Sequence, residues 1–212
     1  MKSPFVSVLL PVYNEAKSIS KLYTELKIAL IDIDHELIFI NDGSTDSSFI
    51  QIQKYARGAI IISLPHQGKW KALEQGYGHA HGNVIVTCDS DLQDDPKEMR
   101  RLLEYAKKYD VVSGWRKSRQ DSLLKRIAAQ LGSTVFGFHD MNSSLKLFKR
   151  EVFEKLPKEK SLLRFSLYFA KRSGLKVIEV PVVHRRRKFG KSKFGVTKYV
   201  GILYDALRIQ FL

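Results

Sequence analysis

The sequence lacks most of the features that mark secreted or membrane-spanning proteins. Its 212 residues include one cysteine, Cys88, so no internal disulfide bond can form, which suits a reducing compartment. No signal peptide is visible, because the apolar run after Pro4 ends at residues 13–15. No run reaches the ~18–20 apolar residues that a membrane-spanning helix needs. We therefore expect any membrane contact to be made at the surface or through a partner.

Internal repeats, low-complexity tracts and linker-like segments are also missing. With 44% hydrophobic and 27% charged residues, the chain has the composition of a globular protein, and its length fits one domain with a real core. The six histidines show no spacing typical of a metal site. Cys88 falls on an apolar stretch, which favours a place in the core.

Negative charge is scarce in the second part of the chain. Residues 1–96 contain 8 Lys and Arg against 12 Asp and Glu, whereas residues 97–212 contain 28 against 10. Such asymmetry indicates an anionic partner, which could be nucleic acid, anionic lipid or a phosphorylated substrate. A basic surface without a specific partner is the alternative interpretation.

Apolar strand-like runs alternate with amphipathic helical stretches over the first half. The expected strands are residues 5–10, 36–40, 59–63, 84–88 and 111–113, and the helices between them begin after Ser18, Asp46, Gly68 and Asp95. This alternation predicts an α/β fold with a mostly parallel sheet covered on both faces. Further on, we expect helices at 122–136, 150–156, 162–173 and 196–212, strands at 144–148 and 176–183, and a basic loop at 185–195.

The fourth expected strand ends in a dense group of acidic residues. Asp89 and Asp91 are separated by one residue, and Asp94 and Asp95 follow. In an open α/β sheet, the carboxyl ends of the strands form the edge where ligands bind. Two carboxylates this close repel each other and gain most from a divalent cation such as Mg²⁺ or Mn²⁺. A solvated acidic turn before a helix is the alternative.

Two other strands end in a similar way. Asn41, Asp42 and Gly43 follow the second strand, where a carboxylate could accept hydrogen bonds from a nucleobase or ribose. An Asx-turn with a helix cap explains the same pattern and is the interpretation we give to Asp46. Residues 11–15 follow the first strand and could line the same pocket.

Six segments together carry a family resemblance. They are Pro11 to Glu15, Asn41 to Asp46, Gln67 to Lys69, Asp89 to Pro96, Val112 to Arg116, and His184 to Lys193. In this order the chain resembles the family 2 glycosyltransferases, and most of all their polyprenol-phosphate (dolichol-phosphate) mannosyl- and glucosyltransferases. The resemblance implies a single domain of GT-A type. It would comprise a nucleotide and metal half (1–115), an acceptor-side half with the basic loop (116–195) and a C-terminal amphipathic helix (196–212).

The resemblance also assigns roles. It implies that Mg²⁺ or Mn²⁺ is held on the donor diphosphate by Asp89, Asp91 and Gln93. The residues that it implies around the nucleotide-sugar are Pro11, Tyr13, Glu15, Asp42, Gly68, Lys69, Asp89, Ser90, Arg187 and Lys193. It assigns the acceptor phosphate to Arg116, Arg126 and Ser133. The catalytic candidates are Asp91, Asp94 and Arg116.

The implied reaction moves a hexose from GDP-mannose or UDP-glucose to a polyprenyl phosphate, with inversion. A phosphate acceptor is already an anionic nucleophile, so it needs little help from a general base. Asp91 and Asp94 are the nearest candidates for such a base. The implied location is peripheral, on the cytoplasmic face of a membrane, with Arg185, Arg186 and Lys188 of the basic loop facing anionic lipid. Many members of the family continue into transmembrane helices beyond the point where this sequence ends. A membrane-anchoring partner subunit or a longer natural chain is therefore expected.

Two alternative functions involve a different partner molecule. A polysaccharide or another sugar could replace the lipid acceptor. A nucleic-acid-binding protein would explain the basic charge, but carboxylates at three strand ends would repel phosphate in the absence of a metal ion. The sequence also departs from the family. The segment 132–141 is shorter than the corresponding segment usually is, and Trp70 stands where smaller residues are common.

Overall fold

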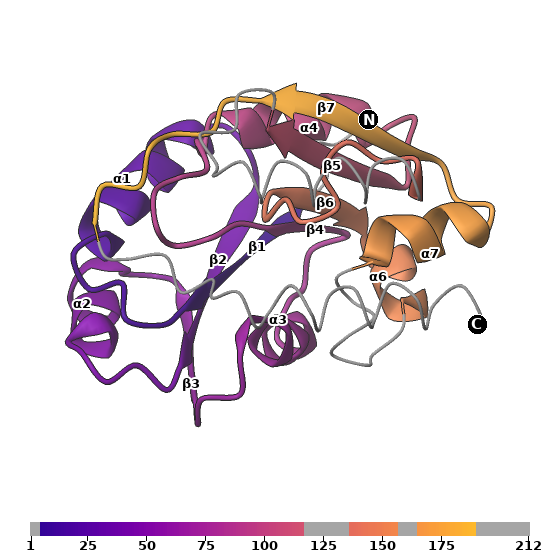
Figure 1. Cartoon of the computed structure of the whole chain (residues 1–212). Helices are drawn as coiled ribbons and strands as arrows, with labels where there is room; N and C mark the ends of the chain where they lie inside the picture. Colours follow the sequence, from indigo (N-terminus) through magenta and orange to yellow (C-terminus); the bar gives the residue numbers. More distant parts are fainter. Residues whose placement is uncertain (1–4, 117–135, 157–164, 190–212) are drawn as a thin grey trace.

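A seven-stranded sheet forms the centre of the molecule (Figure 1). The computed structural model describes residues 5–116, 136–156 and 165–189. The strand order is β3-β2-β1-β4-β6-β5-β7. The strands are β1 (Val6–Val12), β2 (His35–Asp42), β3 (Ile60–Leu64), β4 (Val84–Thr87), β5 (Val111–Arg116), β6 (Lys146–Lys149) and β7 (Val177–Val182). Pro181 is tolerated because β7 is an edge strand of this sheet.

Helices cover both faces of the sheet, as the alternating pattern predicts. They are α1 (Ile19–Ala29), α2 (Ser48–Tyr55), α3 (Lys69–Gly78), α4 (Glu98–Tyr105), α6 (Arg150–Lys155) and α7 (Ser166–Arg172). Apolar residues of α1, α2 and α4 join one core cluster with the alternate side chains of β1, while those of α3, α6 and α7 join the other. Cys88 is 1% exposed in the first cluster, which confirms its predicted place in the core.

The sheet is parallel except around β6. Strands β1 to β4 pair in parallel, and so do β5 and β7, but β6 runs antiparallel between β4 and β5. In this register Lys146, at the start of β6, lies opposite Thr87, at the end of β4. The reversal therefore brings residues just before β6 to the edge that carries the acidic segment after β4.

Two expected helix starts differ in detail. Ser18 occupies the N-cap position of α1, but its hydroxyl donates to the carbonyl of Glu15 at 2.8 Å instead of capping the helix. Helix α4 begins at Glu98, one turn after the predicted Asp95-Pro96 signal, and in that preceding turn the Asp95 carboxylate accepts the Lys97 amide at 3.0 Å. The Asx-turn predicted at Asp46 is confirmed, since its carboxylate accepts the Ser48 amide at 2.9 Å, but the N-cap residue of α2 is Ser47.

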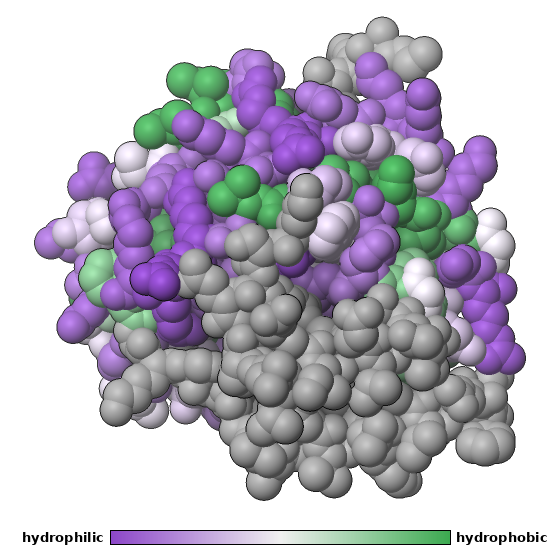
Figure 2. All heavy atoms as spheres, turned by 45° about the horizontal axis from the view of Figure 1, so that its top comes forward, coloured by the Kyte–Doolittle hydropathy of each residue, from purple (hydrophilic) through white to green (hydrophobic). Residues whose placement is uncertain are grey.

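The helix predicted for 196–212 lies outside the described residues, and so does all of the one predicted for 122–136 except Phe136. Among the described helices, none combines the length and apolarity that a bilayer-crossing segment requires. In Figure 2, apolar side chains form separate groups within a mainly hydrophilic surface. The most exposed large apolar side chain is Ile31, directly after α1, at 82%.

Gly43, in the turn after β2, needs both a left-handed backbone and the absence of a side chain. Its φ is +65°, and a Cβ there would lie 2.5 Å from the backbone nitrogen of His66. We expect Gly43→Ala to lower the free energy of unfolding by roughly 2–4 kcal/mol, from backbone strain plus the clash.

Gly58→Ala is the matched control. Gly58 also has a left-handed backbone (φ +78°), but no atom lies within 4 Å of the position that a Cβ would take there. Only the strain of roughly 1–2 kcal/mol is then expected. Urea unfolding at 25 °C measures both variants, and equal losses would show that the contact with His66 contributes nothing.

Candidate functional site

The carboxyl ends of β2, β1 and β4 are adjacent, and the loops that follow them are tied together. The Asn14 side-chain oxygen accepts the Thr45 amide at 2.7 Å, which joins the loops after β1 and β2. The Ser90 hydroxyl donates to the carbonyl of Pro11 at 2.8 Å, which joins β1 to the segment after β4. The structure thus brings together the three segments that the sequence singled out.

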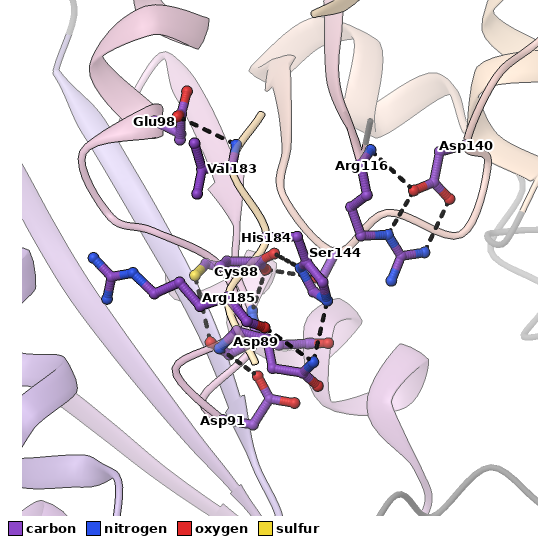
Figure 3. Close-up of polar contacts among 12 residues, drawn as sticks. Cys88, Asp89, Asp91, Glu98, Arg116, Asp140, Ser144, Val183, His184 and Arg185 are labelled. Carbon is purple, nitrogen blue, oxygen red and sulfur yellow. Dashed lines mark hydrogen bonds and ion pairs between the residues drawn. The ribbon is translucent and has the colours of Figure 1, made fainter. Parts of the chain in front are cut away.

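Asp89 and Asp91 lie just after β4 (Figure 3). Each is paired with a cation from a distant segment. Lys69, the first residue of α3, places Nζ 2.5 Å from Asp89, and an Arg187 guanidinium nitrogen lies 2.9 Å from Asp91. Arg187 also pairs with Glu15. The turn that follows Asp91 is tight, since Leu92 is buried with a φ of +63°.

The environment of Asp91 disfavours its charged form. Its side chain is only 12% exposed. Burial, followed by the nearby charge of Asp89, raises the pKa of Asp91 to about 6, although the Gln93 amide and Arg187 oppose this shift. Two carboxylates held this close at one strand end store unfavourable electrostatic energy, which an additional cation would relieve.

Asp94 connects the acidic segment to β6 and β7. It is 2% exposed, and its carboxylate accepts the Ser144 hydroxyl at 2.5 Å and lies 3.5 Å from Nδ1 of His184. Burial alone would raise the pKa of Asp94, but the His184 ring and the Ser144 hydroxyl hold it below its ordinary value. Gln93, a predicted metal ligand, directs its side-chain amide toward the His184 ring at 3.1 Å. Both residues therefore hold neighbouring segments in place in this structure.

Residues 183–189, which we call the basic strap, leave β7 and run beside α1 (Figure 1). The Val183 amide donates to Glu98 at 3.3 Å, and the Arg185 amide donates to the Gln93 carbonyl at 2.7 Å. The Arg185 guanidinium pairs with Glu25 and Asp95 at 2.5 and 2.7 Å. The expectation that Arg185 faces lipid is therefore wrong, because its charge is neutralised within the protein.

Asp42 organises the loop before α3. Its carboxylate, 2% exposed, accepts the amides of Gln67 and Gly68 at 2.8 and 2.9 Å. The His66 ring from the same loop stacks on Tyr13, with ring centroids 3.9 Å apart. Predicted nucleotide-binding residues from three segments thus form one aromatic and amide-rich surface beside the acidic pair.

Arg116, at the end of β5, lies to one side of the acidic group (Figure 3). Its guanidinium forms a two-point ion pair with buried Asp140, at 2.6 and 3.0 Å. Glu179 on β7 accepts the Asp140 amide at 2.8 Å and the His139 amide at 2.6 Å. This ion pair fixes the orientation of the Arg116 guanidinium.

The carboxylates after β4 are compatible with a divalent metal ion shared with a substrate. Within the described ranges, no group of three or more His, Cys, Asp or Glu side chains is arranged as a metal site. Mg²⁺ is usually held by one or two carboxylates together with substrate phosphates. Asp89 and Asp91, which face the cations Lys69 and Arg187, supply such an incomplete set of oxygen ligands.

Three of the predicted site residues, Arg126, Ser133 and Lys193, lie outside the described residues.

Other residues of the site were not foreseen. Sequence reasoning missed the roles of Asp140, Ser144, His184 and Lys146. Lys146 is 2% exposed, and burial together with the charge of Lys69 lowers its pKa to about 7. The sequence held one signal for such buried charged residues: a charged residue within an apolar run, as at Lys146.

Comparison with known proteins agrees with this arrangement. The family model described as Glycosyl transferase family 2 matches residues 7–159. The undecaprenyl-phosphate 4-deoxy-4-formamido-L-arabinose transferase of Sodalis glossinidius (strain morsitans) is 32% identical over 97% of this chain and 67% of its own length. The protein of the same description from Klebsiella pneumoniae (strain 342) is 30% identical over 94% and 65%. The chain thus spans about two thirds of the length of these relatives.

Solved structures share the fold. Mannosyl-3-phosphoglycerate synthase from Rubrobacter xylanophilus gives a TM-score of 0.78 at 15% identity, over 98% of this chain and 73% of the other. Glucosyl-3-phosphoglycerate synthase from Mycobacterium tuberculosis, in complex with Mn²⁺, UDP and glucosyl-3-phosphoglycerate, gives 0.75 at 20% identity, over 97% and 79%. The likeness confirms the expected GT-A fold.

The raised pKa of Asp91 predicts a stabilising substitution. Because the folded state binds this proton more tightly than the unfolded state, ionised Asp91 destabilises the fold above about pH 6, and the effect fades as the pH falls toward 4. We expect Asp91→Asn to raise the free energy of unfolding by roughly 1–3 kcal/mol at pH 7.5. Urea unfolding in the presence of a metal chelator measures this difference.

Asp110→Asn is expected to do the opposite. Burial would raise the pKa of Asp110, but hydrogen bonds from Lys149 and the Lys176 amide outweigh it and lower the pKa. The stabilisation from this carboxylate is present at neutral pH and is lost in acid. If Asp91→Asn were as destabilising as Asp110→Asn at pH 7.5, the account of strain at the acidic pair would be wrong.

Proposed function

The chain belongs to glycosyl transferase family 2, and from that membership we propose that it transfers a sugar from a nucleotide-sugar to a polyprenyl phosphate. The observation that carries the proposal is the acidic pair at the carboxyl end of β4, where Asp89 meets Lys69 and Asp91 meets Arg187. Carboxylates for a metal ion and cations for phosphate, side by side, are what a nucleoside diphosphate requires.

The donor occupies the edge formed by β1, β2 and β4 in this proposal. Tyr13, Glu15 and Asp42 line the nucleotide side, and Lys69 and Arg187 neutralise the charge that develops on the leaving diphosphate. Asp89 and Asp91 hold Mg²⁺ or Mn²⁺, with Gln93 beside them. When bound, the ion supplies further positive charge to the diphosphate. Two of the solved neighbours contain UDP with Mn²⁺ or Mg²⁺, which supports this choice.

The acceptor approaches from the β5 side. Arg116, oriented by Asp140, grips the acceptor phosphate, together with Arg126 and Ser133. A phosphate oxygen attacks the anomeric carbon, the bond from that carbon to the diphosphate oxygen breaks, and the nucleoside diphosphate leaves with the electron pair. The attacking oxygen is already anionic, so Asp91 and Asp94 need not remove a proton. Inversion at the anomeric carbon follows from a single displacement.

The lipid acceptor rests on the curated relatives, whose names give undecaprenyl phosphate as the acceptor. Their names give 4-deoxy-4-formamido-L-arabinose as the sugar, so a nucleotide form of that sugar joins GDP-mannose and UDP-glucose as donor candidates. We also propose that the transfer takes place at the cytoplasmic face of a membrane, because a polyprenyl phosphate is a membrane lipid. A membrane-anchoring partner subunit belongs to the same proposal.

A transfer assay tests the acceptor and the acidic pair together. The protein is incubated with Mn²⁺, each radiolabelled donor and undecaprenyl phosphate in detergent micelles. We expect label in the lipid fraction, and a loss of at least roughly a hundredfold in turnover for Asp91→Asn, since the metal ion that Asp91 would hold neutralises the charge that develops on the leaving diphosphate.

Asp32→Asn provides the control carboxylate. Asp32 is exposed, pairs with Arg100 on the surface and lies away from the site, so its turnover should match the wild type. Transfer to an oligosaccharide but not to lipid phosphate would replace the proposed acceptor with a carbohydrate. Full activity in Asp91→Asn would contradict the proposed site itself.

A further inference from the structure

A small cavity lies beneath the acidic pair, between α3, the start of β6 and α7. Its volume is about 20 Å³. Lys69 and Trp70, both half-buried, line its outer part, while Ser143, Lys146 and Ser166 line its buried part. Leu73, Phe148, Phe153 and Leu156 complete an apolar wall. None of these residues except Lys69 has a place in the proposed transfer reaction.

The buried polar groups around the cavity have hydrogen-bonding capacity left over. The hydroxyls of Ser143 and Ser166, 3% and 2% exposed, find no partner within the part of the chain that the structure describes. The Lys146 ammonium donates one described hydrogen bond, to the Met141 carbonyl at 2.7 Å, and lies 6.0 Å from the centre of the Trp70 ring. Burying such donors unsatisfied is costly, so an oxygen acceptor is the group that these side chains would stabilise.

The volume limits the group that fits. A cavity of about 20 Å³ holds roughly one water-sized group. A hydroxyl or a carbonyl oxygen of a substrate fits this space.

The position of the cavity identifies the source of that oxygen. Lys69 lines the cavity and reaches Asp89, at 2.5 Å, in the proposed diphosphate site. In a nucleotide-sugar the group joined to the diphosphate is the sugar ring. A ring bound at the acidic pair would carry its substituents toward the neighbouring cavity.

We propose that this cavity is a specificity pocket, which receives a single oxygen-bearing substituent of the transferred sugar and binds it through Lys146, Ser143 and Ser166, with Trp70 as one wall. The inference rests on the proposed function, because it needs a nucleotide-sugar at the acidic pair. Trp70 lines the cavity and forms one side of this arrangement. Lys146 and Ser166 act as specificity-determining residues, while the chemistry of transfer stays with the residues above the pocket.

Calorimetry in Mn²⁺ tests the pocket with UDP, UDP-xylose, UDP-glucose and UDP-glucuronate, and with GDP and GDP-mannose. The UDP-sugars differ only in the substituent at one ring carbon. For the best-bound sugar, Lys146→Met and Ser166→Ala should each reduce the affinity by roughly five- to tenfold, while the affinity for the free nucleoside diphosphate stays unchanged. Both variants should also narrow the differences in affinity among the sugars.

Two matched controls separate this effect from a general disturbance. Ser113 has a buried hydroxyl without a described partner, like Ser166, but does not line the cavity. Lys71 lies on α3 near Lys69, but pairs with Glu74 on the surface. Ser113→Ala and Lys71→Met should leave every affinity at its wild-type value. Thermal unfolding of each variant confirms that it is folded.

The outcomes distinguish failure of the pocket from failure of the proposed function. If wild-type protein binds neither UDP nor GDP, the proposed function fails, and the pocket assignment fails with it. If nucleotides bind but Lys146→Met and Ser166→Ala change the sugar and nucleotide affinities equally, or change neither, the cavity holds only water and the pocket assignment alone is overturned.

Discussion

The repulsion among three carboxylates at the end of one strand is the constraint on which the site depends. Asp89, Asp91 and Asp94 follow β4 within six positions, and each is offset by a group from a distant part of the chain. Lys69 comes from α3, whereas Arg187 and His184 come from the basic strap. The uneven charge of the sequence has this structural counterpart: basic residues of the second half fold back onto acidic residues of the first. The strap is held in place by the same ion pairs that make the acidic pair tolerable.

These ion pairs also explain how the site is prepared for an anionic ligand. Lys69 and Arg187 lie beside the carboxylates, so in the proposed function a nucleoside diphosphate with its metal ion would find both the cations and the carboxylates that it needs in place. The arrangement has a cost in stability, because Asp91 is buried close to Asp89 and its pKa is raised to about 6. A site that stores such strain and is relieved by its ligand is typical of functional surfaces.

Much of the site could be predicted because its residues follow strands. Asp89, Asp42 and Glu15 each come directly after an apolar run, and parallel strands carry their carboxyl ends to one edge of the sheet. The strand β6 was predicted at residues 144–148, but its antiparallel direction could not be predicted, since periodicity does not report direction. The pairing of Arg116 with Asp140 and the burial of Lys146 both depend on that strand and its loop, so they stayed hidden. The Asp95-Pro96 signal did mark the turn that precedes α4, where the Asp95 carboxylate accepts the Lys97 amide at 3.0 Å, although the helix itself begins at Glu98.

The central claim is that the acidic pair binds a nucleoside diphosphate together with a divalent cation. Isothermal titration of the wild type and of Asp91→Asn with UDP and with GDP, each with Mn²⁺ and with chelator, tests it most directly. The account predicts that the wild type binds one of the two nucleotides at least roughly tenfold more tightly with Mn²⁺, and that Asp91→Asn loses this metal dependence while remaining folded. Nucleotide binding that is equally strong in chelator, or metal dependence that survives in Asp91→Asn, would contradict it.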